Sequence, residues 1–321
     1  MPKPQLTRHP YGITAVDAEY IRSGLAAAHI IQERGRAAFV DPGTSHSVPY
    51  LLAALEELGI ERAAVDYIFL THVHLDHAGG TGTLLKMLPN ARVVLHPRGA
   101  PHLIEPTKLI GASIKVYGAE PFQRLYGDIV PLPSERVLIA QDLLRLELAG
   151  RTFEFVHTPG HALHHQAIVD LRHAGIFAGD TVGVSYREMD TKNGAFIVPT
   201  TTPSQFDPEQ LVQSIDRLMT YAPESLYLMH FSRVTGIARL VAALKPQIYE
   251  FVRIALEHAN APDRAAAIAA AMFDLWRTLA RRHGCKMNDA DLEECLGKDV
   301  ELNTQGLIAW LERRQKIKVT A

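Results

Sequence analysis

The chain has 321 residues, of which 47% are hydrophobic, and its 33 Lys and Arg against 35 Asp and Glu give a net charge of −2. This balance offers no basic surface for binding phosphates, and no apolar run approaches the roughly 20 residues that span a membrane. We therefore expect an enzyme for a small-molecule substrate, with no nucleic-acid or membrane partner. Because the chain starts Met-Pro-Lys-Pro-Gln, without a signal-like apolar core, we expect a cytoplasmic location.

Strands and helices alternate along the first half of the chain. Residues 25–33 and 36–40 flank Arg34-Gly35, which predicts a β-hairpin, and Asp41-Pro42-Gly43 ends its second strand. Leucines form one helical stripe within residues 47–59, and β-branched and aromatic residues predict a buried strand over 63–70. A helix near 83–87 and a strand over 92–95 complete this half.

The second half repeats the strands and then becomes helical. We predict strands within 137–156 and over 166–170, 176–178 and 226–229, with an amphipathic helix over 208–220. Residues 96–131 and 181–208 are predicted to be irregular loops that roof the site. The tail is predicted to be helical over 237–257, 261–284 and 304–316, with an acidic turn at 288–291. We expect a catalytic domain, 1–235, and a helical C-terminal region, 236–321, covering the core.

The most informative segment is Thr-His-Val-His-Leu-Asp-His-Ala-Gly-Gly at residues 71–80, directly after a predicted strand. In extended backbone the side chains at i and i+2 lie on one side, so His72 and His74 can converge on one ion. Asp76 and His77 lie past this part and can face a second ion. Imidazole nitrogen and carboxylate oxygen suit borderline divalent metals. One loop cannot complete two sites, and three further candidates follow predicted strands: His161, Asp180 and His230.

With these motifs the chain resembles the metallo-β-lactamase-fold hydrolases, on their glyoxalase II-like side, over roughly residues 10–235. The matching elements are the Asp41-Pro42-Gly43 turn, the His-x-His-x-Asp-His signature, the Thr158-Pro159-Gly160-His161 loop, the Gly179-Asp180 pair and His230. The resemblance implies an α/β fold, the four-layer αββα metallo-β-lactamase sandwich with a C-terminal helical appendage. It also implies two divalent metal ions, with zinc favoured over iron or manganese: one held by His72, His74 and His161, the other by Asp76, His77 and His230, and Asp180 bridging them.

The ligand set implies a dinuclear metal-dependent hydrolase of a small thioester or ester. Two cations that share a bridging water lower its pKa enough to give hydroxide near neutral pH. Asp76 is also a catalytic candidate because it can accept a hydrogen bond from that hydroxide, and Tyr186 because it can stabilise an oxyanion or protonate a leaving group. True β-lactamases of this superfamily lack the bridging Asp, and flavo-diiron relatives carry Glu at the position of His74, so antibiotic hydrolysis and oxygen reduction are disfavoured.

Several alternatives stay open. The same centre would serve a lactonase or a phosphodiesterase, and a metal-bearing sensor or binding protein with vestigial activity belongs to another class. Asp41 or His157 could hydrogen-bond a ligand imidazole. His164 and His165 either contact substrate or are buried and hydrogen-bonded, and Arg313 with Lys316 either grip a substrate carboxylate or end a solvated helix. Cys285 and Cys295 are expected to be packing residues, and a homodimer through the helical tail is left open.

Overall fold

The computed structural model describes residues 2–201 and 205–320. These residues cluster into two compact units. The first unit consists of Met1–His157, His164–Gly179 and Pro223–Arg233, and the second of Thr158–Leu163, Asp180–Ala222 and Val234–Ala321. The expected division at residue 235 stays a prediction.

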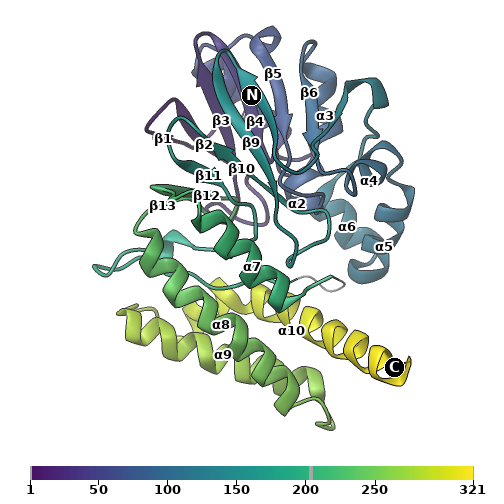
Figure 1. Cartoon of the computed structure of the whole chain (residues 1–321), viewed down its shortest axis with the longest axis vertical. Coiled ribbons are helices and arrows are strands. Elements are labelled where there is room, and N and C mark those ends of the chain that lie inside the picture. The colour runs from purple at the N-terminus through teal and green to yellow at the C-terminus, as the bar shows by residue number, and fades with distance from the viewer. Residues whose placement is uncertain (1, 202–204, 321) are drawn as a thin grey trace. The chain divides into compact units, whose positions relative to one another are not determined.

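The larger β-sheet has seven strands in the order β1-β2-β3-β4-β5-β6-β7 (Figure 1). Strands β1 to β4 pair antiparallel with their neighbours, and strands β4 to β7 pair parallel. The predicted hairpin around Arg34-Gly35 is confirmed, because Glu33 pairs with Arg36. The strands are β1 (Leu6–His9), β2 (Ile13–Asp17), β3 (Ala27–Glu33), β4 (Arg36–Val40), β5 (Val65–Phe69), β6 (Arg92–Leu95) and β7 (Val137–Ile139).

The smaller sheet has the order β13-β12-β11-β10-β9-β8. Its strands are β8 (Leu144–Leu148), β9 (Arg151–His157), β10 (Gln166–Asp170), β11 (Gly175–Phe177), β12 (Ser225–Leu228) and β13 (Ser232–Val234). Aromatic side chains fill the space between the two sheets: Phe69 of β5 lies edge-on to Phe155 of β9, with ring centroids 5.1 Å apart. The sheets therefore pack face to face, as in other β-sandwich cores.

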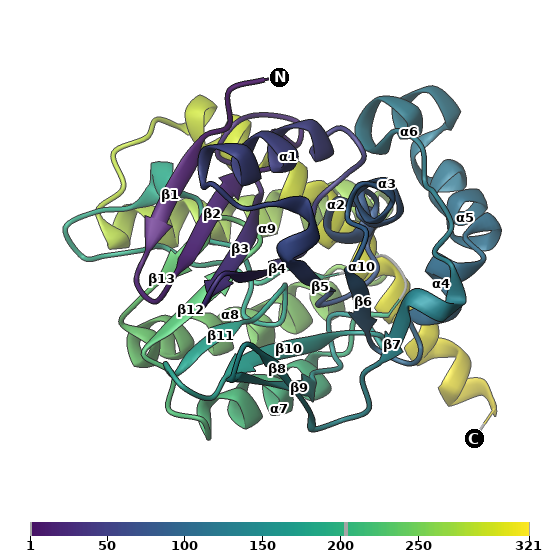
Figure 2. The same cartoon turned by 90° about the horizontal axis from the view of Figure 1, so that it is seen from above.

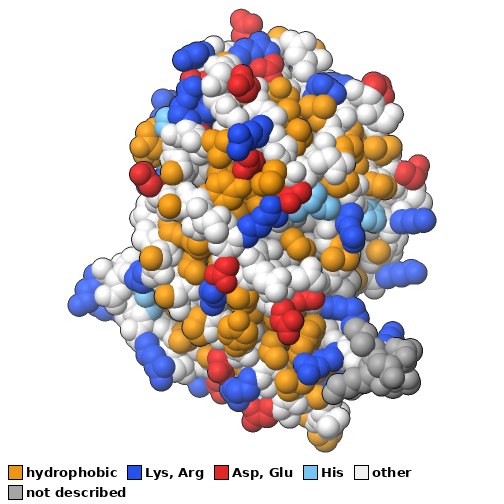
Figure 3. Space-filling view, viewed as in Figure 1, with side chains coloured by type: hydrophobic (Ala, Val, Ile, Leu, Met, Phe, Trp, Pro, Cys, Tyr) orange, Lys and Arg blue, Asp and Glu red, His pale blue; other side chains and the backbone are white. Residues whose placement is uncertain are grey.

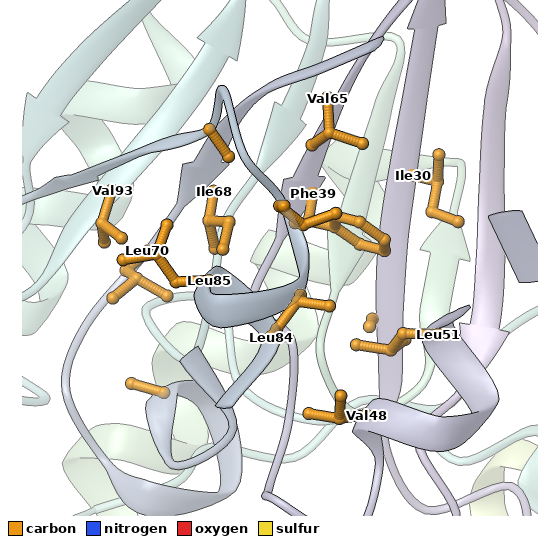
Figure 4. Packing of buried hydrophobic residues seen from close by; sticks show 14 of the residues in the cluster. Ile30, Phe39, Val48, Leu51, Val65, Ile68, Leu70, Leu84, Leu85 and Val93 are labelled. Carbon is orange, nitrogen blue, oxygen red and sulfur yellow. The ribbon is translucent and has the colours of Figure 1, made fainter. Parts of the chain in front are cut away.

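Helices α1 (Val48–Glu57) and α3 (Thr81–Met87) cover the other face of the larger sheet (Figures 2 and 4). Val48 and Leu51 of α1 and Leu84 of α3 are buried in one cluster with strand residues such as Phe39 and Ile68. Burying each such side chain stabilises the fold by about 1.5–3 kcal/mol. The first unit is thus a helix layer on two stacked sheets, which confirms the expected mixed α/β class.

Residues 96–131 are not irregular, and this prediction was wrong. They form α4 (Ala100–Ile104), α5 (Thr107–Tyr117) and α6 (Ala119–Tyr126). Three of the five prolines that suggested a loop stand at the beginnings of these helices: Pro101 lies in the first turn of α4, Pro106 precedes α5, and Pro121 lies in the first turn of α6. The first turn of a helix tolerates proline because its N–H groups have no intrahelical acceptor. The remaining short helices of the first unit are η1 (Arg62–Ala64), α2 (Leu75–Ala78) and η2 (Ser134–Arg136).

The second unit contains η3 (Arg187–Met189), α7 (Pro208–Met219), α8 (Ile237–Glu257), α9 (Arg264–His283) and α10 (Asp289–Thr320). The expected C-terminal helical region is therefore confirmed. The predicted acidic turn is instead the start of α10, where the Asn288 side chain accepts a hydrogen bond from the Asp291 N–H at 2.9 Å. Asn at this position caps the helix, and acidic residues in its first turn suit the helix dipole. Cys285 and Cys295 are both buried, as expected of packing residues.

Among residues 2–201 and 205–320, no helix combines the length and the apolar character needed to cross a bilayer. On the face drawn in Figure 3, Lys and Arg side chains are interspersed with Asp and Glu. The expectations of a small-molecule substrate, of no nucleic-acid or membrane partner and of a cytoplasmic location stay predictions.

Candidate metal centre

The first two predicted ligands lie side by side just beyond the end of β5. His72 Nε2 is 2.8 Å from His74 Nδ1. His72 Nδ1 lies 3.1 Å from the Thr71 hydroxyl oxygen, whose own hydrogen is directed at Asp41 Oδ2 at 2.6 Å. Thr71 therefore accepts from His72 Nδ1, which leaves a lone pair on Nε2 facing His74. Extended backbone after the strand is what turns both imidazoles to one side.

Asp76, His77 and His230 form a second group. Asp76 and His77 come from the short helix α2, and His230 follows β12. Asp76 Oδ2 is 3.4 Å from His230 Nε2 and 3.8 Å from His77 Nε2. His77 and His230 are both buried. Two imidazole nitrogens thus converge on one carboxylate oxygen.

Hydrogen bonds on the far side of each ring assign the protons. His77 Nδ1 lies 2.9 Å from Asp41 Oδ2, and His230 Nδ1 lies 2.9 Å from the Leu25 carbonyl oxygen. Both partners are acceptors, so each Nδ1 carries the hydrogen and each Nε2 keeps its lone pair. Lone pairs and a carboxylate oxygen that face one another in a buried site repel unless a cation lies between them. The donor set therefore fits a borderline divalent metal.

Asp41 supports both histidine groups and hydrogen-bonds the imidazole of His77, while the role of His77 as a ligand stays a prediction. Its buried carboxylate accepts from the Thr71 N–H at 2.8 Å, from the Thr71 hydroxyl and from His77 Nδ1. Its φ of +48° is unusual, but Asp is one of the few residues that adopt this region readily. His157, the other candidate, lies with Nε2 2.9 Å from the Ala140 carbonyl oxygen and with its ring against His96, centroids 4.0 Å apart.

Two more histidines lie against the first pair. The buried ring of His165 stacks on His72 with centroids 4.8 Å apart, and the ring of His164 lies 5.5 Å from that of His74 and 6.1 Å from that of His102. Gly179 makes room here, because an added Cβ would lie 2.5 Å from His165 Nε2. Both histidines are buried, and the choice between a hydrogen-bonded packing role and contact with substrate stays a prediction.

The second unit brings together the other two predicted ligands, His161 and Asp180. His161 Nε2 lies 3.3 Å from Asp180 Oδ2, and both side chains are buried. His161 Nδ1 lies 3.3 Å from the Thr200 carbonyl oxygen, so this imidazole has the same proton arrangement as His77 and His230. The preceding Gly160 is needed for close packing: at φ +127°, an added Cβ would lie 2.2 Å from the backbone nitrogen of Leu211 in α7.

Tyr186 is buried, and its hydroxyl lies 3.0 Å and 3.2 Å from the two carboxylate oxygens of Asp299 on α10. A phenol has one hydrogen, and here it is donated to Asp299. To donate to a substrate oxygen, Tyr186 would have to give up this bond, so its catalytic role stays a prediction. Arg313, also on α10, donates to the Phe206 carbonyl oxygen at 2.5 Å, and so packs within its own unit.

The chain just after His230 is supported from behind by two further histidines. The Ser232 hydroxyl lies 2.9 Å from His9 Nε2 and 3.3 Å from His29 Nε2. Burial, with a smaller effect of neighbouring His9, lowers the pKa of His29 to about 3. Burial also lowers the pKa of His9 to about 4, with a smaller effect of Arg233. Both imidazoles are therefore neutral near pH 7.

The supporting residues that sequence reasoning missed are Thr71, Thr200, Asp299 and the carbonyl group of Leu25. Thr71 could have been found, because it directly precedes His72 and its hydroxyl is within reach of that ring. The Leu25 and Thr200 groups act through backbone oxygens. A backbone acceptor has no residue-specific signature in the sequence.

Comparison with known proteins agrees with this geometry. The family model described as the metallo-beta-lactamase superfamily matches residues 23–230. The chain is 27% identical over 210 residues to the metallo-beta-lactamase fold-containing protein ST1585 of Sulfurisphaera tokodaii, a match covering 64% of this chain and 72% of that protein. It is 28% identical over 153 residues to a hydroxyacylglutathione hydrolase of Aeromonas hydrophila, covering 48% of this chain and 45% of that protein.

Among solved structures, the metallo-beta-lactamase family protein TTHA1429 from Thermus thermophilus superposes with a TM-score of 0.64 at 21% identity. The superposition covers 98% of this chain and 95% of that one, and it shows a likeness of fold. The family model alone spans well over half of the chain, and it includes every ligand candidate from His72 to His230. The chain therefore belongs to the metallo-β-lactamase superfamily.

Proposed function

We propose that the chain is a dinuclear metal-dependent hydrolase that acts on a small thioester or ester. In this proposal His72, His74 and His161 hold one divalent ion, Asp76, His77 and His230 hold the other, and Asp180 bridges the two. Zinc is the favoured metal, because neutral imidazole and carboxylate groups are its usual ligands beside thiolate.

One observation carries the proposal: two buried imidazole nitrogens with assigned lone pairs face a single oxygen of Asp76. The Nδ1 hydrogens of His77 and His230 are donated to Asp41 and to a backbone carbonyl, so neither ring can donate to Asp76 from Nε2 without becoming a buried cation. Such an arrangement is typical of metal ligands whose far nitrogen is fixed by an acceptor. The pairs His72 with His74 and His161 with Asp180 support the proposal in the same way.

The residues of the chain have distinct proposed roles. When bound, the two ions supply the positive charge that lowers the pKa of water and polarises a carbonyl oxygen. Asp76 accepts a hydrogen bond from the attacking water and so orients its lone pair toward the carbonyl carbon. Tyr186 stabilises the developing oxyanion or protonates the leaving group once its hydrogen turns away from Asp299. The chain needs no Ser or Cys nucleophile for this reaction.

The choice of a thioester or ester is supported by the matched relatives named hydroxyacylglutathione hydrolase. An acylglutathione is a thioester, and its carbonyl carbon is open to attack by an activated water. These relatives match about half of the chain at 28% and 30% identity, so they support the bond that is cleaved rather than the substrate.

The test is a substrate panel run on metal-reconstituted protein, with elemental analysis of the same sample. The panel contains thioesters, aryl esters, lactones, bis-nitrophenyl phosphate and a β-lactam. We expect two ions per chain and hydrolysis of thioesters or esters that is lost on chelation. Turnover confined to lactones or phosphodiesters would show that the protein cleaves one of these bonds rather than the proposed thioester or ester bond. Two bound ions without turnover would favour a sensor or binding protein.

A pair of variants separates chemistry from folding. Asp76→Asn should lower kcat about 10²-fold or more, because it removes the oriented acceptor and also one proposed ligand of the second ion. Asp66→Asn is the matched control: Asp66 is a half-buried aspartate of β5 whose partner is Arg36 of β4. The control should keep the activity of the unaltered protein.

A further inference from the structure

Helix α10 is tied to the peptide that follows Thr200. Asn303 of α10 is 1% exposed, and its side-chain oxygen Oδ1 accepts a hydrogen bond from the Thr201 N–H at 2.5 Å. The Thr201 hydroxyl donates in turn to the backbone carbonyl of Asn303 at 3.3 Å. Two hydrogen bonds thus hold one residue of the 181–201 segment against one residue of the helix.

The carbonyl group of the same peptide accepts a hydrogen bond from His161. The carbonyl of Thr200 and the N–H of Thr201 belong to one planar peptide, in which the two groups point in opposite directions. The N–H is donated to Asn303, while the carbonyl accepts from His161 Nδ1 at 3.3 Å. Hydrogen bonds to Asn303 on one side and to His161 on the other therefore hold the peptide plane. The orientation of this plane sets the position of the carbonyl oxygen that accepts from the imidazole.

The other nitrogen of His161 faces Asp180. Its Nε2 lies 3.3 Å from Asp180 Oδ2, and the two side chains are 2% and 8% exposed. A hydrogen on Nδ1 leaves the lone pair on Nε2, so the Thr200 carbonyl fixes both the tautomer and the aim of the ring. Donation from the Thr201 N–H to Asn303 also polarises the peptide and makes the Thr200 carbonyl a better acceptor.

We propose that Asn303 is a positioning residue for His161: through the Thr200–Thr201 peptide it sets the imidazole that is to bind metal, and so it determines the affinity of one of the two ions. This inference rests on the proposed function, in which His161 is a ligand. Asn303 would act without touching metal or substrate.

The state of the Asn303 amide supports this role. Its nitrogen Nδ2 is buried and has no hydrogen-bond partner among the described residues. A buried donor without a partner destabilises a fold, so this nitrogen does not stabilise the packing of the helix. The oxygen is the useful atom, because it holds the Thr201 N–H.

A second contact from α10 supports the other flank of His161. Arg313 donates to the Phe206 carbonyl, and the next residue, Asp207, donates its N–H to the Gly160 carbonyl at 2.8 Å. Gly160 directly precedes His161. The long C-terminal helix thus supports the ligand loop at two points, and Asn303 is the one that reaches the imidazole itself through a single peptide.

The test measures metal affinity and stoichiometry by competition with a chromophoric chelator, using zinc on the full chain. Asn303→Leu keeps a side chain of similar size without the acceptor. We expect it to lower the affinity for one of the two ions by about 10- to 100-fold and to leave the affinity for the other unchanged. Asn303→Asp keeps the acceptor oxygen and puts a second carboxylate oxygen in place of the unpartnered nitrogen, so it should restore most of that affinity. Such a rescue would not follow from packing alone.

Thr304→Val is the matched control. Thr304 is the next residue of α10, is buried to a similar degree, and directs its hydroxyl at the sulfur of Met272 in α9, at 3.9 Å. It should leave both affinities unchanged. Thermal unfolding of each variant shows whether it is folded, and Asn303→Ala, which also lacks the acceptor, takes the place of Asn303→Leu if that variant does not fold.

Two different failures can be told apart. Wild-type affinity for both ions in folded Asn303→Leu, or no rescue in folded Asn303→Asp, would overturn the positioning role. His161→Ala should abolish binding of the same ion. If His161→Ala instead bound both ions as before, the ligand set of the proposed function would fail, whatever the result at Asn303.

Discussion

The substitution Asp41→Asn should weaken metal binding at the proposed centre while leaving its shape intact. Asp41 Oδ1 accepts from the Thr71 N–H, and Oδ2 accepts from the Thr71 hydroxyl and from His77 Nδ1. An asparagine must keep its oxygen toward the Thr71 N–H, because its NH₂ group there would meet another donor. The NH₂ group then takes the place of Oδ2 and points at His77 Nδ1.

This reversal moves protons onto the nitrogens that are proposed to bind metal. His77 Nδ1 must become an acceptor, which puts its hydrogen on Nε2. The Thr71 hydroxyl must accept from the amide, so its own hydrogen turns toward His72 Nδ1, 3.1 Å away, and His72 also becomes protonated on Nε2. Loss of such a supporting partner typically lowers metal affinity about 10- to 100-fold, which corresponds to about 1.4–2.8 kcal/mol at 1.4 kcal/mol per tenfold.

The assay is a competition titration with a chromophoric chelator, combined with denaturant unfolding of the metal-free protein. We expect both ions to bind more weakly, and the free energy of unfolding to fall by about 1–3 kcal/mol from the lost charged hydrogen bonds. Asp17→Asn is the matched control, since Asp17 is also buried and accepts three hydrogen bonds, from the Glu19 N–H, the Ser23 hydroxyl and the Gly24 N–H, but none from an imidazole. Unchanged affinity for both ions in Asp41→Asn would refute the reasoning.

Three further outcomes are expected. Gly160→Ala should lower the free energy of unfolding by about 2–4 kcal/mol, because its Cβ would collide with α7 at a strained φ; urea denaturation that showed no loss would contradict the packing. The pKa of buried His29 is lowered to about 3, so below pH 6.5 this imidazole takes up a proton in the unfolded state but not in the folded state. The free energy of unfolding should therefore fall by about 2 kcal/mol between pH 7 and pH 5. Denaturant titrations at both pH values should show that the His29→Gln variant lacks this part of the fall. Removing metal with EDTA should lower the melting temperature, since ions at 100 times their Kd add about 2.7 kcal/mol, and His77→Ala should show a smaller drop.

The elements that could be read from the sequence are those with local patterns. The hairpin around Arg34-Gly35 and helix α8 follow from turn chemistry and a 3.6-residue period, and both appear at the expected residues. The motif from His72 to His77 is equally local, because its ligands stand at fixed offsets after a strand. The motif supplies His72 and His74 to one group of candidate ligands and Asp76 and His77 to the other. The one further rule used was that ligands follow strands, and the same rule selected His230.

The features that could not be read depend on context. Proline breaks a helix interior but begins a helix well, so Pro101, Pro106 and Pro121 suggested a loop where α4 to α6 lie. Asn288 looked like part of a turn, although it caps α10. Asn303 gave no signal at all, since its role depends on a peptide about one hundred residues earlier in the chain.

The imidazoles of His77, His230 and His161 are each anchored by oxygen atoms of the protein itself. Rings restrained in this way have little rotational freedom left to lose when a cation arrives, in contrast to zinc fingers, which fold only around their metal. Loading and exchange of ions should therefore proceed in the native state, without refolding of the polypeptide. A site of nitrogen and oxygen ligands discriminates only weakly among first-row divalent cations. The ion bound in a cell would therefore be set by the local supply of metals.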